Sequence, residues 1–162
     1  MKPALAAKKT KLLKRVAGFK GYHSRHCRET DWLLRKHLAN EVEKIRDRLA
    51  DIMVNRQEPD PLREKFSYSL KTLAYLKAEL SPAELEEGLA TGLSPAVEEL
   101  VMDADLILLE KVEGLHTPLD EMEGSGPSDR IEAALSLFDE GLAEVDDQFQ
   151  LRRRLCRNRT PA

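Results

Sequence analysis

The sequence predicts an all-α fold, an antiparallel helical bundle of about four long helices with one or two short ones. Apolar residues recur at alternating spacings of three and four in several segments, which places them on one face of a helix. No segment of useful length alternates apolar with polar residues as a half-buried strand does. Links containing proline or glycine separate the periodic segments, as is common between neighbouring helices of a bundle. The residues expected to fill the core are Leu38, Val42, Ile45, Leu49, Leu73, Leu108, Leu135, Phe138, Leu142 and Val145.

Start and stop signals set the expected limits of each helix. Gly18 and Gly21 follow the first helix, since glycine adopts the left-handed conformation at a helix end without steric cost. Pro59 and Pro61 stop the second helix and favour a tight hairpin to the third. Residues 116–128 are rich in glycine and proline, so a long loop is expected there. The expected helices cover residues 3–17, 24–56, 62–80, a short stretch opened by Ser81 and Pro82, 95–115 and 128–156.

Charge is strongly sorted along the chain. Residues 1–77 carry a net charge of +10, residues 78–147 a net of −18 and residues 148–162 a net of +5, although the total is only −3. Such a distribution suits either a charged partner or internal neutralisation, in which acidic helices pack against basic ones. We expect a basic N-terminal segment over residues 1–22, which could be mobile, followed by a helical bundle domain over residues 23–158.

The compartment signals favour a cytoplasmic protein. Cys27 and Cys156 are two thiols far apart in the sequence, and two cysteines do not make a disulfide framework. The N-terminus lacks the continuous apolar stretch of a secretory signal, and no segment is apolar over the length that spans a bilayer. No cofactor is expected, because the chain has neither a nucleotide-binding loop nor a complete metal framework.

One short segment carries residues that could bind a metal or react as a thiol. His23, His26 and Cys27 are spaced so that pairs of them could share a helix face, and both residue types bind zinc or copper. Cys27 also lies among cationic neighbours near a helix start, which favours a thiolate. The competing interpretation is a basic helix start with surface histidines and a buried cysteine, since the second half of a zinc framework is missing.

The basic residues near both ends of the chain could form a binding surface. Lysine and arginine neutralise phosphates and acidic protein surfaces, and Phe19 and Tyr22 are interleaved with them near the N-terminus. The competing interpretations are a solvated face at the N-terminus and a favourable interaction with the helix dipole at the C-terminus. The residues assigned to this surface are Lys8, Lys9, Lys11, Lys14, Arg15, Lys20, Arg25, Arg28, Arg152, Arg153 and Arg154.

These patterns favour a non-enzymatic, coiled-coil-like interaction or scaffold protein with separate basic and acidic surfaces. No catalytic motif occurs, so an enzymatic role has no support in the sequence. Its partner would be another protein or a second copy of the chain. Two alternatives stay open, namely a nucleic-acid-binding accessory protein that uses the basic residues, and a metal or thiol protein centred on His23, His26 and Cys27.

Overall fold

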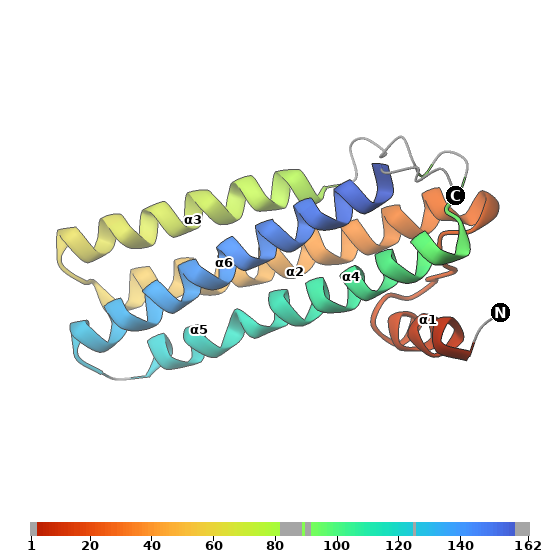
Figure 1. The fold of residues 1–162 in the computed structure, drawn as a ribbon. Helices are drawn as coiled ribbons and strands as arrows, with labels where there is room; N and C mark the ends of the chain where they lie inside the picture. The colour runs from red at the N-terminus through yellow and green to blue at the C-terminus, as the bar shows by residue number, and fades with distance from the viewer. Residues whose placement is uncertain (1–2, 82–88, 90–91, 125, 158–162) are drawn as a thin grey trace. The chain divides into compact units, whose positions relative to one another are not determined.

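The computed structural model describes residues 3–81, 89, 92–124 and 126–157, and within these ranges the chain is α-helical with no strand. The all-α helical bundle predicted from the sequence is confirmed (Figure 1). The short helix expected from Pro82 onwards lies outside the described residues. No helix among those described is both long and apolar enough to cross a bilayer. The elements are α1 (Pro3–Arg15), the 3-10 helix η1 (Ser24–His26), α2 (Cys27–Arg56), α3 (Asp60–Leu80), α4 (Pro95–Gly114), α5 (His116–Glu123) and α6 (Ser128–Arg157).

The chain divides into two compact units. Unit 1 comprises residues 1–37, 81–109 and 147–162, and unit 2 comprises residues 38–80 and 110–146. Helices α2, α4 and α6 are long enough to contribute residues to both units. The N-terminal segment that the charge pattern sets apart lies wholly in unit 1, where five of its apolar side chains are buried. These side chains are Leu5, Leu12, Val16, Phe19 and Tyr22.

In unit 2, α2 and α3 form the antiparallel hairpin that the two prolines predict. Gln57 adopts a positive φ of 50° at the turn, and the amides of Leu62 and Arg63 both donate to the carbonyl of Pro59 at 3.0 Å. The ion pair between Lys77 and Glu43, at 3.0 Å, joins the far end of α3 to α2. The two helices therefore run alongside each other in opposite directions.

The second hairpin is formed by α4 and α6. Lys111 pairs with Glu144 at 3.1 Å in unit 2, whereas the Gln148 side chain donates to the carbonyl of Ala104 at 3.4 Å in unit 1. Residue numbers rise along α6 as they fall along α4, so these helices are also antiparallel.

Helix α3 lies beside α6 in unit 2, and the two run in the same direction (Figure 1). Lys65 of α3 contacts Glu132 of α6. One turn further along α3, the Ser69 hydroxyl donates to Asp139 of α6 at 2.5 Å. Residue numbers rise together along the two helices. Neighbours within each hairpin are thus antiparallel, whereas the contact between the hairpins is parallel.

The prediction of a loop over residues 116–128 is wrong for residues 116–123, which form α5. Leu119 and Met122 are buried, and with Leu115 they continue an apolar face at spacings of four and three. Arg48 of α2 holds the exposed side of α5 through Glu123, at 2.7 Å, and Asp120. Glycine and proline content suggested a loop, but the apolar spacing of the segment decides its structure.

A buried carboxylate joins the α2–α3 turn to the start of α6. Glu58 is 8% exposed and accepts hydrogen bonds from Arg56 and from the Ser128 hydroxyl, both at 2.7 Å. These donors hold the pKa of Glu58 below its usual value, with the Ser128 hydrogen bond as the larger cause. Arg56 also donates to the carbonyls of Gly124 and Gly126 at 2.9 and 2.8 Å, which fixes the connection between α5 and α6.

The predicted core is confirmed in full, since each of the ten apolar residues named from the sequence is buried. Ile45 of α2 and Phe138 of α6 have 0% exposure, and both lie in unit 2. Aromatic residues are scarce, so leucine and valine fill most of the remaining core.

Truncating Ile45 or Phe138 to alanine should destabilise the protein. Loss of buried apolar surface and the cavity left behind cost about 2–5 kcal/mol for Ile45→Ala and about 3–5 kcal/mol for Phe138→Ala. Chemical denaturation of each variant measures this loss. Val54→Ala is a suitable control, because Val54 on α2 is 66% exposed and its truncation should change stability by less than about 0.5 kcal/mol. Equal stability of all three variants would contradict the assignment of the core.

Candidate functional site

The basic residues expected to form a binding surface lie in unit 1, and part of their charge is neutralised there. Lys8 of α1 contacts Glu99 and Asp103 of α4, both at 2.9 Å, and these contacts raise the pKa of Lys8. Lys20 contacts Glu29 at 3.2 Å. The other members of the set with exposed or half-exposed side chains are Lys9, Lys11, Lys14, Arg15, Arg25, Arg28, Arg153 and Arg154.

Arg152 does not belong to a basic surface, contrary to the expectation from the sequence. Its side chain has 0% exposure and lies against Asp105 of α4 at 2.5 Å and Asp31 of α2 at 2.8 Å. Position 152 continues the stripe of Val145 and Phe149 on α6 by the same spacings of four and three. Its side chain therefore points into the core of unit 1 and not to solvent.

His23, His26 and Cys27 do not form the predicted metal site. The Cys27 thiol is buried and donates to the carbonyl of Leu89, whereas the His23 Nδ1 atom lies 3.2 Å from the Glu98 carboxylate. Over the residues that the structure describes, no group of three His, Cys, Asp or Glu side chains could hold a metal ion. The Cys27 thiol is buried at the start of α2, whereas His23 is exposed and His26 is half-exposed.

A buried polar cluster of Tyr22, Asp31, Asp105 and Arg152 lies in the core of unit 1. The Tyr22 hydroxyl donates to Asp105 and accepts from Arg152 at 2.9 Å. Arg152 lies against both carboxylates, so one cation is shared by two anions and a phenol. All four side chains are at most 1% exposed, so this cluster has no surface at which a dissolved substrate could reach it.

The backbone before η1 positions Tyr22 for this cluster. Gly21 has a φ of +87°, which side chains rarely tolerate, and a Cβ atom there would lie 2.9 Å from the Glu98 carboxylate. That carboxylate accepts a hydrogen bond from the Tyr22 amide at 2.6 Å, and the Leu93 amide donates to the Tyr22 carbonyl at 2.8 Å. Both backbone groups of Tyr22 are thus satisfied while its ring enters the core.

Burial and neighbouring charges shift the pKa of Asp105 in the cluster in opposite directions. Loss of hydration raises the pKa of Asp105 to about 6, although Arg152 and the Tyr22 hydroxyl favour its ionised form. Burial raises the pKa of Tyr22 well above its usual value. Burial opposes the charge of Arg152, but the carboxylates raise its pKa further, so the guanidinium stays charged. At neutral pH the cluster therefore holds an ion pair between Arg152 and an ionised Asp105.

The sequence predictions do not include this cluster, although the sequence contains a signal for it. Asp105 and Arg152 fall in phase with the apolar stripes of α4 and α6, where a charged side chain is expected only with a buried partner. An acid and a base in the core positions of two helices could have been paired from that pattern. The sequence does not reveal that Tyr22 joins them, because its placement depends on the conformation of Gly21.

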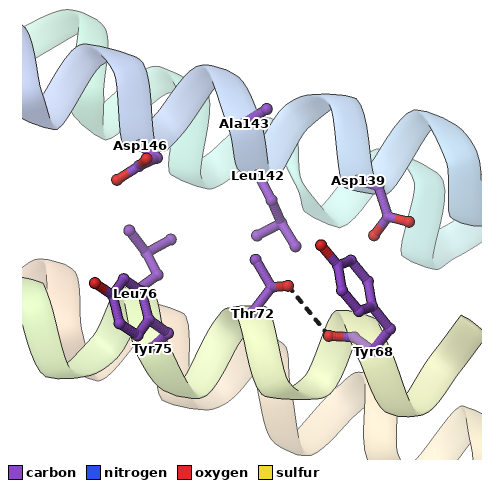
Figure 2. A pocket seen from close by; sticks show the side chains of 8 residues that line it. All are labelled: Tyr68, Thr72, Tyr75, Leu76, Asp139, Leu142, Ala143 and Asp146. Atoms are coloured by element: carbon purple, nitrogen blue, oxygen red, sulfur yellow. Dashed lines mark hydrogen bonds between the residues drawn. The ribbon is translucent and has the colours of Figure 1, made fainter.

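A groove between α3 and α6 in unit 2 has the properties of a binding surface (Figure 2). Its volume is about 280 Å³. Tyr68 and Tyr75 on α3 are 68% and 69% exposed, and tyrosine is enriched where proteins bind one another. The lining contains two carboxylates and no lysine, arginine or histidine. The lining residues are Tyr68, Thr72, Tyr75, Leu76, Asp139, Leu142, Ala143 and Asp146.

The groove repeats one pair of residues along its length. Tyr68 and Asp139 lie at one end, whereas Tyr75 and Asp146 lie at the other (Figure 2). The two tyrosines are seven positions apart on α3, and the two aspartates are seven apart on α6. Seven residues are nearly two helical turns, so the second pair faces the groove as the first does, about 10.5 Å further on.

The Asp139 carboxylate at one end of the groove is partly buried. Partial burial raises the pKa of Asp139, and the hydrogen bond from the Ser69 hydroxyl only partly offsets this effect. A cation bound at this end of the groove would stabilise the ionised carboxylate, which has lost some of its hydration.

A larger pocket in unit 1 is less suited to a charged ligand. Its volume is about 670 Å³, and its lining is mainly apolar. Its Glu98 carboxylate is buried and accepts from the Tyr22 amide, and its Glu99 carboxylate is already paired with the cation of Lys8. The lining residues are Leu5, His23, Pro95, Ala96, Glu98, Glu99 and Leu100.

No protein family, no curated protein and no solved structure matches this chain.

Replacing Arg152 with leucine should destabilise the protein strongly. The substitution leaves Asp105 buried without its cation and Asp31 with only the longer contact to Arg35, at 3.9 Å, and breaking a buried pair in this way costs about 3–5 kcal/mol. Arg154→Leu, on an exposed position of the same helix, is the matched control and should cost less than about 1 kcal/mol. Denaturant titration measures both, and similar midpoints for the two variants would refute the structural role of Arg152.

Asp105 should make stability depend on pH in a defined window. Its pKa is raised on folding, from the usual 3.8 to about 6, so the folded protein binds this proton more tightly than the unfolded chain does. This contribution to the free energy of unfolding is fully present below about pH 4 and is lost as the pH rises through 6.

The Asp105→Asn variant removes that contribution, so comparing its free energy of unfolding with that of the native protein from pH 4 to 7 isolates it. Glu58 and Glu123, whose pKa values are lowered on folding, act in the opposite sense and are present in both proteins. Parallel curves for the two proteins over this range would be inconsistent with the role given to Asp105.

Proposed function

We propose that this chain is a non-enzymatic protein-binding protein whose groove between α3 and α6 accepts a cationic segment of a partner. The observation that carries the proposal is the pairing of exposed tyrosine rings with carboxylates in one groove. A ring face attracts a cation, and a carboxylate forms a charge-assisted hydrogen bond with it. The same groove offers both contacts twice.

Arginine fits this groove better than lysine does. A guanidinium is planar, so it stacks on a tyrosine ring and still donates two parallel hydrogen bonds to a carboxylate. The ammonium of lysine is more strongly hydrated and cannot make the stacked contact. The partner segment is therefore expected to contain arginine.

The charge of unit 2 supports a basic partner. Unit 2 contains 10 Lys/Arg and 19 Asp/Glu residues, a net charge of −9, whereas unit 1 contains 16 and 10, a net of +6. A strongly acidic unit attracts a cationic segment over a distance of about one screening length and speeds its encounter with the groove.

A cytoplasmic scaffold role is consistent with this proposal. Cys27 and Cys156 are buried and are not joined in a disulfide, as is usual for thiols in a reducing compartment. The polar cluster in unit 1 is closed to solvent, which favours a structural role for it over a catalytic one.

Removing one tyrosine or one carboxylate from the groove should weaken binding of a basic probe. We expect Tyr68→Ala and Asp139→Asn each to weaken binding of a labelled arginine–alanine peptide about tenfold, because each loses a cation contact. Fluorescence anisotropy measures the affinity. Glu140→Gln is the matched control for Asp139→Asn, since Glu140 is an exposed acid on α6 outside the groove lining. Equal affinity of all variants would exclude the groove as the binding site.

A nucleic-acid partner gives a different result in the same assay. A nucleic acid would contact the exposed lysines and arginines of unit 1, so its retention would fall with salt and would not change in Tyr68→Ala or Asp139→Asn. Tight binding of a DNA or RNA oligonucleotide together with no binding of the basic peptide would favour the nucleic-acid alternative.

A further inference from the structure

The repeated pair in the groove has a spacing that specifies its occupant. Tyr68 with Asp139 and Tyr75 with Asp146 form two cation sites about 10.5 Å apart, the rise of seven residues in an α-helix. A partner helix presents side chains at the same interval when they are seven positions apart, because these side chains lie on one face.

We propose that the groove binds a helical segment of a partner protein that carries two arginines seven positions apart. This inference rests on the proposed function and adds the spacing and conformation of the partner segment. One guanidinium contacts Tyr68 and Asp139, and the other contacts Tyr75 and Asp146.

The walls of the groove favour a helix over an extended segment. An extended peptide gains affinity from main-chain hydrogen bonds to a sheet edge, but α3 and α6 satisfy their own backbone groups. A helix also satisfies its own backbone and can lie along two others with its side chains between theirs. The partner therefore contributes side chains alone.

The middle of the groove has room for an apolar side chain between the two arginines. Thr72 and Ala143 are smaller than the tyrosines at either end, and Ala143 is exposed and apolar (Figure 2). A residue three or four positions after the first arginine would lie over this region. Leucine or methionine at that position completes the partner pattern.

The chain's own α1 is a poor occupant for the groove of a second copy. Lys8 and Arg15 have the required spacing, with Leu12 between them. However, Lys8 is bound by Glu99 and Asp103, and Leu12 has 0% exposure in unit 1. Presenting α1 to another molecule would break these contacts, so a separate partner protein is the expected source of the helix.

Labelled helical peptides test the spacing directly with the full-length chain. The first peptide is alanine- and glutamine-rich with two arginines seven positions apart and leucine midway between them. The second has the same composition but places the arginines five positions apart, on different faces of the helix. We expect the first to bind about tenfold more tightly by fluorescence anisotropy, and Asp139→Asn and Asp146→Asn each to reduce this advantage. Glu140→Gln should keep it, and circular dichroism verifies that the variants are folded.

The possible failures are distinguishable. Equal affinity for the two peptides, with both weakened by Asp139→Asn, would overturn the spacing while leaving the proposed function intact. Tighter binding of a proline-rich extended peptide with arginines three positions apart, which also spans about 9 Å, would overturn the helical conformation. No binding of any of these peptides would overturn both the spacing and the proposed function.

Discussion

The fully buried guanidinium of Arg152 imposes the strongest constraint on unit 1. A charge without water is stable only with counter-charges and hydrogen-bond acceptors close by. Asp31 and Asp105 supply the counter-charges, and the Tyr22 hydroxyl accepts a hydrogen bond, each from a separate segment. The requirement fixes the rotation of α2, α4 and α6 about their axes within that unit. It also explains why the chain before η1 bends at Gly21, since only that path brings the Tyr22 ring to Asp105.

Unit 2 is held by a different kind of contact. Its interior is mainly apolar, and apart from the Arg56–Glu58 pair the ion pairs between its described residues are at least partly exposed, so that each contributes little on its own. The Ser69–Asp139 hydrogen bond sets the register of α3 against α6. That register places the tyrosines of one helix opposite the aspartates of the other, so the groove is a consequence of how the two hairpins pack.

The distribution of charge between the two units differs from the order of basic and acidic segments along the chain. Along the chain, a basic half precedes an acidic one, which suggests that the N-terminus could neutralise the acidic helices. In the structure, Lys8 does contact Glu99 and Asp103 of α4, but those acids belong to the same unit as the basic segment. The acids of residues 110–146 belong to unit 2, where acidic residues outnumber basic ones. The chain therefore carries one basic and one acidic unit.

Most of the helices and the core residues follow from local patterns in the sequence. Ile45 and Phe138 are buried because their positions on an apolar stripe leave them no other environment, and Pro59 ends α2 since its ring cannot continue a helix. Local patterns decide such features. By contrast, the glycine and proline content of residues 116–128 predicted a loop, but the chain forms α5 there. The helix forms because burying Leu119 and Met122 on one apolar face outweighs the composition of the segment.

The positions of the charged side chains depend on how distant segments pack together. Arg152 and Arg154 are two positions apart in one arginine run, yet one is buried and the other is exposed. The groove likewise joins Tyr68 to Asp139 across about seventy residues of sequence, and no local pattern links them. Which face of a helix is buried depends on the segment that packs against it. That partner is a distant segment whose identity depends on how both hairpins fold together.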